Sequence, residues 1–503
     1  MDKLNVIDPS FLTLSGDQLA LLGPYFWMIG AALLAMIVGV IRFLPSKWTV
    51  FAVAMVGILG GLFVSANQIG MDRADLFGGM MVADGFSAFF NVLFLGTAAL
   101  SLCASLKYLD KEKLQYPEYT ILLLFSTIGM MLMASALDLI TIFIALEIMS
   151  LSVYVLVGFR RNDRRSNEAA MKYFILGAAA SAILLYGSAL LYGSTGTFVI
   201  TEILARISAK GDLMTPVFHL GAWMVLAGFL FKIASVPFHM WLPDVYEGAP
   251  TPITGFMTTG VKAAAFAAFI RVFVAFGYGK DLTSAVEGRL HDVLWVLAVA
   301  TMFIGNVIAL TQTNLKRMLA YSTIAHTGYL LVGMIAAPHA ESGFAPVAMY
   351  LAVYTVMNLG AFAVLSVLAG RGDTGLNLHD LSGLGKRHPW LAFSLAIFLF
   401  SLAGIPPTAG FASKYYLLYS AIQAKEVWLV VLAVLCSAIA VYYYLRVLVY
   451  MYMREPQADT PSAKDFTPAA AAFAVAMMVA MTLQIGILPA KMMAITKRVV
   501  AKL

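Results

Sequence analysis

Residues 231–252 read FKIASVPFHMWLPDVYEGAPTP and continue the apolar run VFHLGAWMVLAGFLF at 217–231. A lysine, Lys232, ends that run, and four prolines follow it: Pro237, Pro243, Pro250 and Pro252. Proline removes a backbone donor and disrupts a helix, so the stretch predicts an apolar helix that breaks beside a charge. Both features are unfavourable in a plain membrane anchor. Together they indicate polar chemistry inside a membrane.

The composition indicates a membrane protein. Of the 503 residues, 61% are hydrophobic and 12% are charged, and the mean hydropathy is +0.86. Soluble domains carry about 25% charged residues. Apolar segments of about 20 residues, long enough to cross a hydrocarbon core of about 30 Å, recur from end to end. They lack the alternation of a transmembrane barrel, so the sequence predicts an all-α polytopic membrane fold.

About fourteen segments are expected to span the membrane, two of them broken. They lie at about 18–43, 48–66, 82–105, 118–136, 139–159, 167–193, 217–245 (broken), 253–277, 290–311, 317–337, 344–369, 388–422 (broken), 427–453 and 466–489. No linker between them is long enough for a soluble domain, so residues 1–503 are expected to form a single integral membrane domain.

The second broken stretch predicts an internal repeat. IPPTAGFA (405–412) lies about 170 residues after VPFHMWLP (236–243), and each is the fourth segment of a five-helix block. Broken helices in corresponding places of two halves are typical of transporters built from paired repeats. The expected organisation is helices 1–3 in 1–117, a first repeat of helices 4–8 in 118–277, a second of helices 9–13 in 290–453, and helix 14 in 466–489.

Neither a redox cofactor nor a nucleotide has support in the sequence. The two cysteines, Cys103 and Cys436, lie far apart in apolar segments, whereas an iron–sulfur cluster needs about four thiolates. No glycine-rich phosphate-binding motif occurs. We therefore expect no cofactor on this chain and no nucleic-acid partner, with the lipid bilayer as its surroundings.

Basic residues are distributed unevenly between the two sets of loops. One set, which includes RRNDRR (160–165) and NLKR (314–317), collects about sixteen Lys and Arg, against about eleven on the other side. The side richer in positive charge normally faces the cytoplasm. The sequence therefore predicts a multi-pass protein with both termini on the periplasmic side.

Five ionisable residues are expected at membrane depth. Glu147 and Lys262 lie near the middle of their segments, at a depth of about 15 Å for Glu147 at 1.5 Å per residue. Lys232 and Lys414 adjoin the two breaks, and His326 lies ten residues beyond Lys316. An ionised side chain at the centre of a spanning helix costs about 2.5–3.5 kcal/mol on insertion scales, so this group predicts a functional path.

Each polar residue also has a structural interpretation. Lys172, near the start of its segment, can extend its amine to the interface. Glu147 and Lys232 can form a static ion pair that only holds helices together. His326 can serve as a hydrogen-bonded structural residue. Two amides, Asn306 and Asn358, are of a type that often joins helices in membranes.

A lysine near a carboxylate has a physical basis for moving protons. Burial favours the neutral amine, while a nearby carboxylate favours the charged form. If the distance between Glu147 and Lys232 changes, the proton affinity of the lysine changes with it. Lysine suits this role because burial shifts its pKa readily, whereas arginine stays charged.

Four stretches resemble one family closely. Residues 145–197, 231–273, 310–331 and 401–422 are similar to subunit N of bacterial proton-pumping NADH:quinone oxidoreductase, respiratory complex I, one of its antiporter-like subunits. The similarity runs from about 85 to about 455. It implies fourteen transmembrane helices in two inverted five-helix repeats, with discontinuous helices 7 and 12. It also implies proton translocation across the bacterial inner membrane, coupled to quinone reduction elsewhere in the complex.

The resemblance also implies a role for each candidate residue. Glu147 and Lys232 would form the coupling pair, Lys262 the central proton carrier and Lys414 the terminal lysine of the path. His326 would lie on the helix that lines the central hydrated path, as a carrier or as a structural residue. NADH, FMN, iron–sulfur clusters and quinone would bind partner subunits, and this chain would contact the antiporter-like subunit M and the small subunits K, J and A.

Three other interpretations remain open at the level of sequence. The chain could belong to a stand-alone or multi-subunit cation/proton antiporter, or to a membrane subunit of a hydrogenase or ferredoxin-linked relative. It could also be a structural subunit without transport of its own. VYEGAPTP (245–252) and GFASKYY (410–416) favour complex I.

Overall fold

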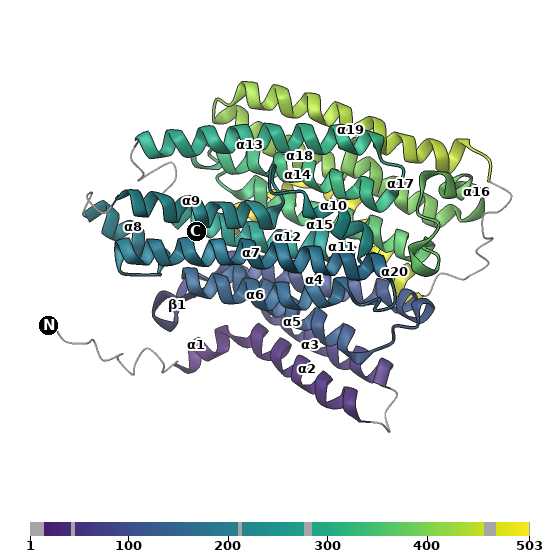
Figure 1. Ribbon diagram of the computed structural model, residues 1–503, viewed down its shortest axis with the longest axis horizontal. Helices are drawn as coiled ribbons and strands as arrows, with labels where there is room; N and C mark the ends of the chain where they lie inside the picture. The colour runs from purple at the N-terminus through teal and green to yellow at the C-terminus, as the bar shows by residue number, and fades with distance from the viewer. Residues whose placement is uncertain (1–14, 42–45, 210–213, 276–283, 457–468, 502) are drawn as a thin grey trace.

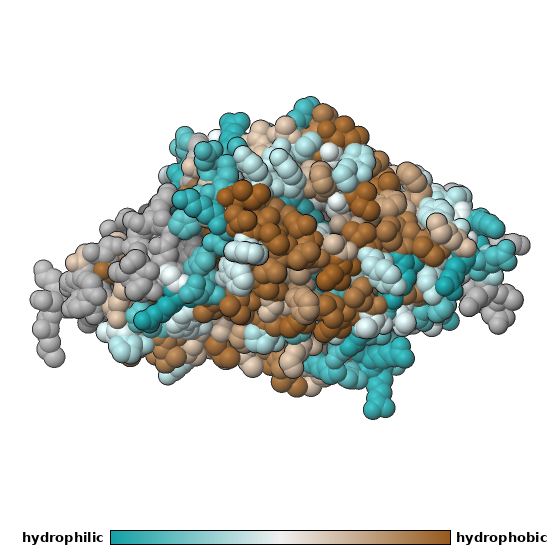
Figure 2. Space-filling model, turned by 90° about the horizontal axis from the view of Figure 1, so that it is seen from above, coloured by the Kyte–Doolittle hydropathy of each residue, from teal (hydrophilic) through white to brown (hydrophobic). Residues whose placement is uncertain are grey.

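The structure is a computed structural model that describes residues 15–41, 46–209, 214–275, 284–456, 469–501 and 503. Its helices lie roughly parallel to one another, with the connecting loops gathered at the two ends of the bundle (Figure 1). In the space-filling view, hydrophobic residues form a broad zone across the middle and hydrophilic residues gather toward both ends (Figure 2). This distribution is expected of a membrane protein, whose lipid-facing surface is apolar and whose water-facing ends are polar.

Helices account for nearly all the regular structure in the described part of the chain. The α-helices are α1 (Gly16–Leu21), α2 (Gly23–Val40), α3 (Ser46–Gln68), α4 (Gly85–Glu112), α5 (Pro117–Ser135), α6 (Leu139–Val157), α7 (Arg164–Thr195), α8 (Ile200–Ala209), α9 (Pro216–Ile233), α10 (Trp241–Gly248), α11 (Thr251–Phe256), α12 (Lys262–Ala275), α13 (Ser284–Thr311), α14 (Leu315–Ala336), α15 (Ala345–Leu368), α16 (Leu384–Arg387), α17 (Pro389–Ala403), α18 (Ala409–Gln423), α19 (Val427–Met453), α20 (Ala469–Ile487) and α21 (Pro489–Val500). A short antiparallel hairpin pairs β1 (Ala74–Leu76) with β2 (Met81–Ala83).

The predicted all-α polytopic fold is confirmed. Among the described residues, 13 helices are long and apolar enough to cross a membrane. The shorter pair α17 and α18 adds one broken segment, which agrees with the expected number of about fourteen. The ends of three expected segments, 42–43, 276–277 and 466–468, lie outside the described residues. Sequence analysis missed the hairpin, α8 and α21, because short or amphipathic elements carry no long apolar run.

Three segments form the centre of the bundle. In α14, in α15 and in the helix that runs from α11 into α12, about nine-tenths of the spanning residues are buried: 94%, 89% and 94%. The corresponding share is 33% in α2, which therefore presents most of its surface outward. Polar side chains carried by the central helices are thus removed from lipid and must find partners inside the protein.

The two expected breaks are present and resemble each other locally. Ala234 follows the end of α9 and Gly404 follows the end of α17, and both residues adopt the left-handed conformation, with φ of 57° and 86°. A cis X–Pro bond follows in each case, at Pro237 and at Pro407. The backbone then resumes a helix, as α10 and α18. The relation between the two halves as paired repeats stays a prediction.

A buried ion pair joins three helices at one end of the bundle. Asp84 caps α4, accepting from the Ser87 N–H at 2.8 Å. Arg271 of α12 forms a bidentate pair with the same carboxylate, at 2.7 and 3.0 Å, and its Nε donates to the Ala134 carbonyl at the end of α5. Burial opposes ionisation of Asp84, yet the guanidinium outweighs burial and holds the pKa of this carboxyl below its usual value.

We expect Arg271→Ala to destabilise the protein by about 3–5 kcal/mol, because Asp84 would remain buried without its partner. The matched control is Arg73→Ala, whose partner Asp75 is exposed and whose loss should cost at most about 1 kcal/mol. The midpoint of heat-induced loss of the folded protein, measured by size-exclusion chromatography, distinguishes them. Equal midpoints for the two variants would show that the buried pair does not hold this end together.

Candidate functional site

The first break exposes backbone groups that side chains of distant helices satisfy. The Ile233 carbonyl, at the end of α9, accepts from Thr327 Oγ1 of α14 at 2.8 Å. The Val236 N–H donates to Thr301 Oγ1 of α13 at 3.0 Å. Trp241 Nε1 donates to the Phe231 carbonyl at 3.2 Å. Side chains of α13 and α14 therefore satisfy backbone groups of the break that follows α9.

Lys232 lies in the last turn of α9 and faces α6. Its Nζ donates to Ser150 Oγ at 2.8 Å and to Tyr154 OH at 3.3 Å. Glu147 is half-buried one turn before Ser150, and its Oε1 has no hydrogen-bond partner in the described part of the chain. Positions three and seven residues apart lie on the same helix face, so Glu147, Ser150 and Tyr154 form one polar stripe. Lys232 therefore contacts the Ser150 hydroxyl, one helical turn after Glu147, and not the Glu147 carboxylate itself. The coupling of Glu147 and Lys232 stays a prediction.

Lys262 lies at the centre of the fold, where a π-helical turn (Met257–Val261) leads into α12. Its Nζ donates to Thr327 Oγ1 at 2.6 Å and to the Thr323 carbonyl at 2.8 Å. Because Thr327 Oγ1 also bonds Ile233, one hydroxyl connects Lys262 to the residue next to Lys232. π-Helical turns are frequent at functional sites, and this one positions a fully enclosed amine.

His326 lies one residue before Thr327 on α14 and is surrounded by tyrosines. Its Nδ1 lies 2.6 Å from Tyr350 OH, and its Nε2 lies 3.4 Å from Tyr444 OH. The ring of Tyr354 is centred 5.0 Å from the imidazole, and its hydroxyl donates to Thr323 Oγ1 at 2.9 Å. These contacts are compatible with a carrier and with a structural residue, so the role of His326 stays a prediction.

Lys414 lies in the second turn of α18, just after the second break. Its Nζ donates to the Leu402 and Ala403 carbonyls, both at 3.0 Å, and to Ser437 Oγ of α19 at 3.1 Å. The amine therefore caps the last turn of α17, whose carbonyls the break leaves without helical partners. A Cβ at position 404 would lie 3.0 Å from Lys414 Cδ, so Gly404 leaves room for the lysine as well as adopting a positive φ.

Sequence analysis missed the tyrosines that connect the ionisable groups. Tyr350 and Tyr354 of α15 contact His326 and Thr323, and Asn358 Nδ2 donates to Tyr354 OH at 2.8 Å. The spacing of Tyr350, Tyr354 and Asn358, four residues each, places them on one helix face and could have revealed them.

Asn306 of α13 contacts α19 and α14, which agrees with the interpretation of this amide as a residue that joins helices. Its Oδ1 accepts from Tyr443 OH at 3.0 Å, and its Nδ2 lies 3.4 Å from Tyr329 OH. The Tyr329 ring in turn lies 5.2 Å from Lys414 Nζ. The polar groups around Lys262, His326 and Lys414 are thus neighbours in one enclosed region. Hydrogen bonds join some of these groups, but within the described part of the protein they do not form an unbroken chain between the three residues.

The sequence matches the family described as NADH:quinone oxidoreductase/Mrp antiporter, transmembrane, over residues 136–440. A relative from Trichlorobacter lovleyi, NADH-quinone oxidoreductase subunit N, is 44% identical over 94% of each chain. A second subunit N, from Rhizobium meliloti, is 42% identical over 88% of each chain. The chain belongs to this family.

Solved structures support the same assignment. A chain of respiratory complex I from Thermus thermophilus, solved with bound aureothin, superposes with a TM-score of 0.78 and 33% identity, covering 94% of this chain and 98% of that one. A chain of the Mrp complex from Dietzia has a TM-score of 0.78 at 21% identity, covering 96% and 97%, and shows that the fold is shared. The resemblance to subunit N that the motifs predicted is confirmed.

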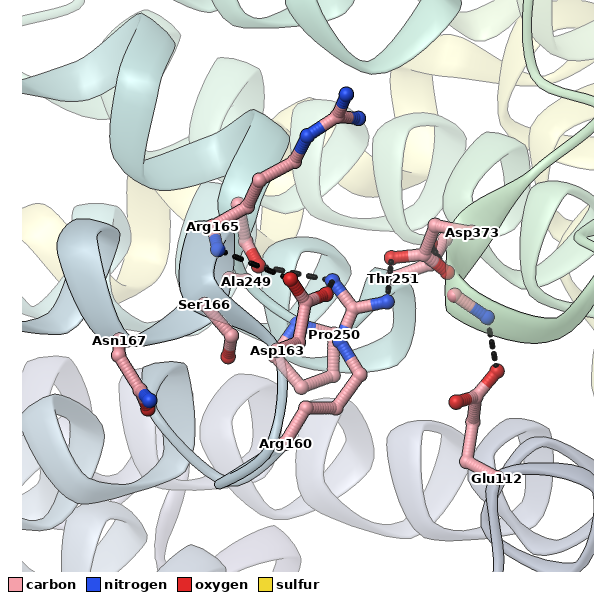
Figure 3. A network of polar contacts seen from close by, with 12 residues as sticks. Glu112, Arg160, Asp163, Arg165, Ser166, Asn167, Ala249, Pro250, Thr251 and Asp373 are labelled. Carbon is pink, nitrogen blue, oxygen red and sulfur yellow. Dashed lines mark hydrogen bonds and ion pairs between the residues drawn. The ribbon is translucent and has the colours of Figure 1, made fainter.

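At one end of the bundle this family member carries a buried ion cluster. The Arg160 guanidinium, in the connection between α6 and α7, lies 3.1 Å from Asp163 and 3.3 Å from Asp373 (Figure 3). Thr251 Oγ1 also donates to Asp373, at 2.8 Å. Lys316, at the start of α14, donates to the same carboxylate at 2.8 Å. Burial opposes ionisation of Asp373, but Lys316 and Arg160 together hold its pKa below its usual value.

Other charges at this end form a separate, open cluster. Lys172 pairs with Glu168 at 2.8 Å and with Asp244 at 2.9 Å, and 42% of its side chain is exposed. Arg317 pairs with Asp244 and with Glu247. Lys172 is thus an ion-paired residue near the start of α7. Within the described ranges, no group of three or more His, Cys, Asp or Glu residues could hold a metal ion.

We expect Thr327→Val to destabilise the protein by about 1–3 kcal/mol, because the Ile233 carbonyl would lose its partner inside the bundle. Valine keeps the shape of threonine, so packing should change little. The control is Thr355→Val on α15, whose hydroxyl, among the residues that the structure describes, bonds only the Leu351 carbonyl of its own helix. Thermal midpoints of the purified protein test the difference, and a loss as large in the control would show that Thr327 does not stabilise the break.

Proposed function

We propose that this chain is the antiporter-like subunit N of the membrane arm of an NADH:quinone oxidoreductase and that it translocates protons. The observation that carries the proposal is the group of buried amines and one imidazole at membrane depth. Lys232, Lys262, His326 and Lys414 are each at least nine-tenths enclosed, and each contacts a hydroxyl group or an aromatic ring. With Glu147 they form the proposed proton path.

The chemistry of the partners supports proton movement over a purely structural role. A hydroxyl both donates and accepts, so Thr327, Tyr444 and Ser150 can stabilise either protonation state of the neighbouring group. A structural ion pair needs an opposite charge in contact. Among the described residues, however, the hydrogen-bond partners of Lys232, Lys262 and Lys414 are all neutral. Charges without a counter-ion at this depth are expensive, and such residues are typical of proton and ion pathways.

Glu147 is proposed to control the first lysine through its charge. It lies one turn from the Ser150 hydroxyl that Lys232 contacts, with one carboxylate oxygen unpaired. Motion of α6 or α9 would change the distance between the carboxylate and the amine, and with it the proton affinity of Lys232. The signal for that motion would come from quinone reduction elsewhere in the complex.

The partners and the redox chemistry are proposed from the family. NADH, FMN, iron–sulfur clusters and quinone would bind other subunits, and this chain would act as part of a translocating enzyme without a redox site of its own. We propose the antiporter-like subunit M and the small subunits K, J and A as its membrane-arm neighbours. The proposed location is the bacterial inner membrane, with the basic loop at 160–165 cytoplasmic and both termini periplasmic, as the positive charge distribution favours.

We expect Lys262→Arg to abolish most proton pumping through this subunit, about as severely as Lys262→Ala. Arginine keeps the positive charge but cannot release a proton at usable pH, so only a carrier role predicts that both variants fail. The control is Lys172→Arg, which changes an exposed, ion-paired lysine and should pump normally. Proton uptake into vesicles, compared with electron transfer in the assembled complex, is the measurement. Full pumping by Lys262→Arg would make Lys262 a structural charge.

We expect Glu147→Ala to impair pumping, and Glu147→Asp to retain part of it, because aspartate keeps the charge at a greater distance from Lys232. Glu118→Ala is the control, since that carboxylate is exposed at the start of α5. The same vesicle assay applies after assembly has been confirmed. Wild-type pumping by Glu147→Ala would refute the proposed coupling.

A further inference from the structure

A lateral groove lies between α9 and α13, and α12 forms its floor. Its volume is about 420 Å³, within the range of about 300–1,000 Å³ that is usual for ligand sites. Phe229, Phe269 and Phe273 form the floor as a continuous aromatic surface, with neighbouring ring centroids 5.4 Å apart. In Figure 1, α9 and α13 run roughly parallel to each other across the bundle.

The walls of the groove continue into lipid-facing surface. Leu226 lines the groove from α9, and residues on the outer sides of the same two helices are exposed and apolar, including Leu220 and Val296 with 54% and 60% exposure. An apolar channel that opens sideways at membrane depth offers no hydrogen bonds to water and matches the hydrocarbon chains of a lipid.

Polar groups gather at one end of the groove only. His219, near the start of α9, and Arg289, near the start of α13, line this end. Arg289 is exposed and makes no hydrogen bond or ion pair with any residue that the structure describes, whereas the nearby Asp292 contacts His291. Trp223 also lines the groove, and tryptophan is enriched where membranes meet water.

We propose that this groove binds one diacyl phospholipid with an anionic headgroup. The acyl chains lie over Phe229, Phe269 and Phe273, and the phosphate accepts hydrogen bonds from Arg289 and His219. A guanidinium binds phosphate oxygens through charge-assisted hydrogen bonds, and the unpaired Arg289 provides the charge complementarity. The site is separate from the proton path, so it does not depend on the proposed function.

The test uses the intact complex in nanodiscs and a phosphatidylglycerol that carries a diazirine in one acyl chain. After irradiation, labelled peptides are identified by mass spectrometry. Label should concentrate on the groove-lining faces of α9, α12 and α13. Arg289→Gln should reduce this labelling about fivefold, as expected for the loss of one hydrogen bond to the headgroup. Leu226→Trp, which fills the groove, should abolish it.

Two matched controls keep the outcome decisive. Lys491→Gln removes an exposed cation of α21, away from the groove, and Leu220→Trp places the same bulk on the outer side of α9. Both should label like the wild type. The proposal is overturned if Arg289→Gln and Lys491→Gln behave alike, if a phosphatidylcholine probe labels the groove equally well, or if label spreads evenly over all lipid-facing helices. Displacement of the probe by a quinone but not by phosphatidylglycerol would also overturn it.

Discussion

Every backbone N–H and C=O inside a bilayer must find its partner within the protein, and the rest of this structure depends on how the two helix breaks meet that requirement. At the first break, Thr327 and Thr301 supply hydroxyls from α14 and α13. At the second, the Lys414 amine itself bonds two carbonyls of α17. Neither break could exist in an isolated helix, so the breaks and the packing of the bundle form together.

The two breaks leave their lysines in different situations. Lys232 contacts hydroxyls of α6, and the carbonyls of its own break are satisfied by other groups. It can therefore change partners without leaving a backbone group unpaired. Lys414 acts as a helix cap, so any departure of its amine would leave two carbonyls needing water or another donor. A change in the position of the Lys414 amine would therefore require hydration of the break.

The buried arginines and the central lysines are used for different purposes. Arg271 at one end and Arg160 at the other make contacts with carboxylates that join several helices. A guanidinium stays charged and matches a carboxylate geometrically, which suits a fixed joint. The amines of Lys232 and Lys262, which can exist in two protonation states, occupy the interior between these joints. This division is consistent with a rigid frame around a path whose charge changes.

The sequence alone determined the fold class, the approximate helices, both breaks and the ionisable residues at membrane depth. Long apolar segments, prolines and isolated charges can be read directly from the sequence. Because few structures satisfy the backbone hydrogen bonds in lipid, these features allow few interpretations in a membrane protein. The family motifs around Lys232 and Lys414 likewise needed no coordinates. Only the tertiary structure decided which groups meet: Lys262 with Thr327, His326 with Tyr350 and Tyr444, and Lys232 with Ser150 rather than directly with Glu147. Those contacts join residues up to about 118 positions apart, and they depend on how each helix is rotated and packed, which the hydropathy of a single segment does not specify.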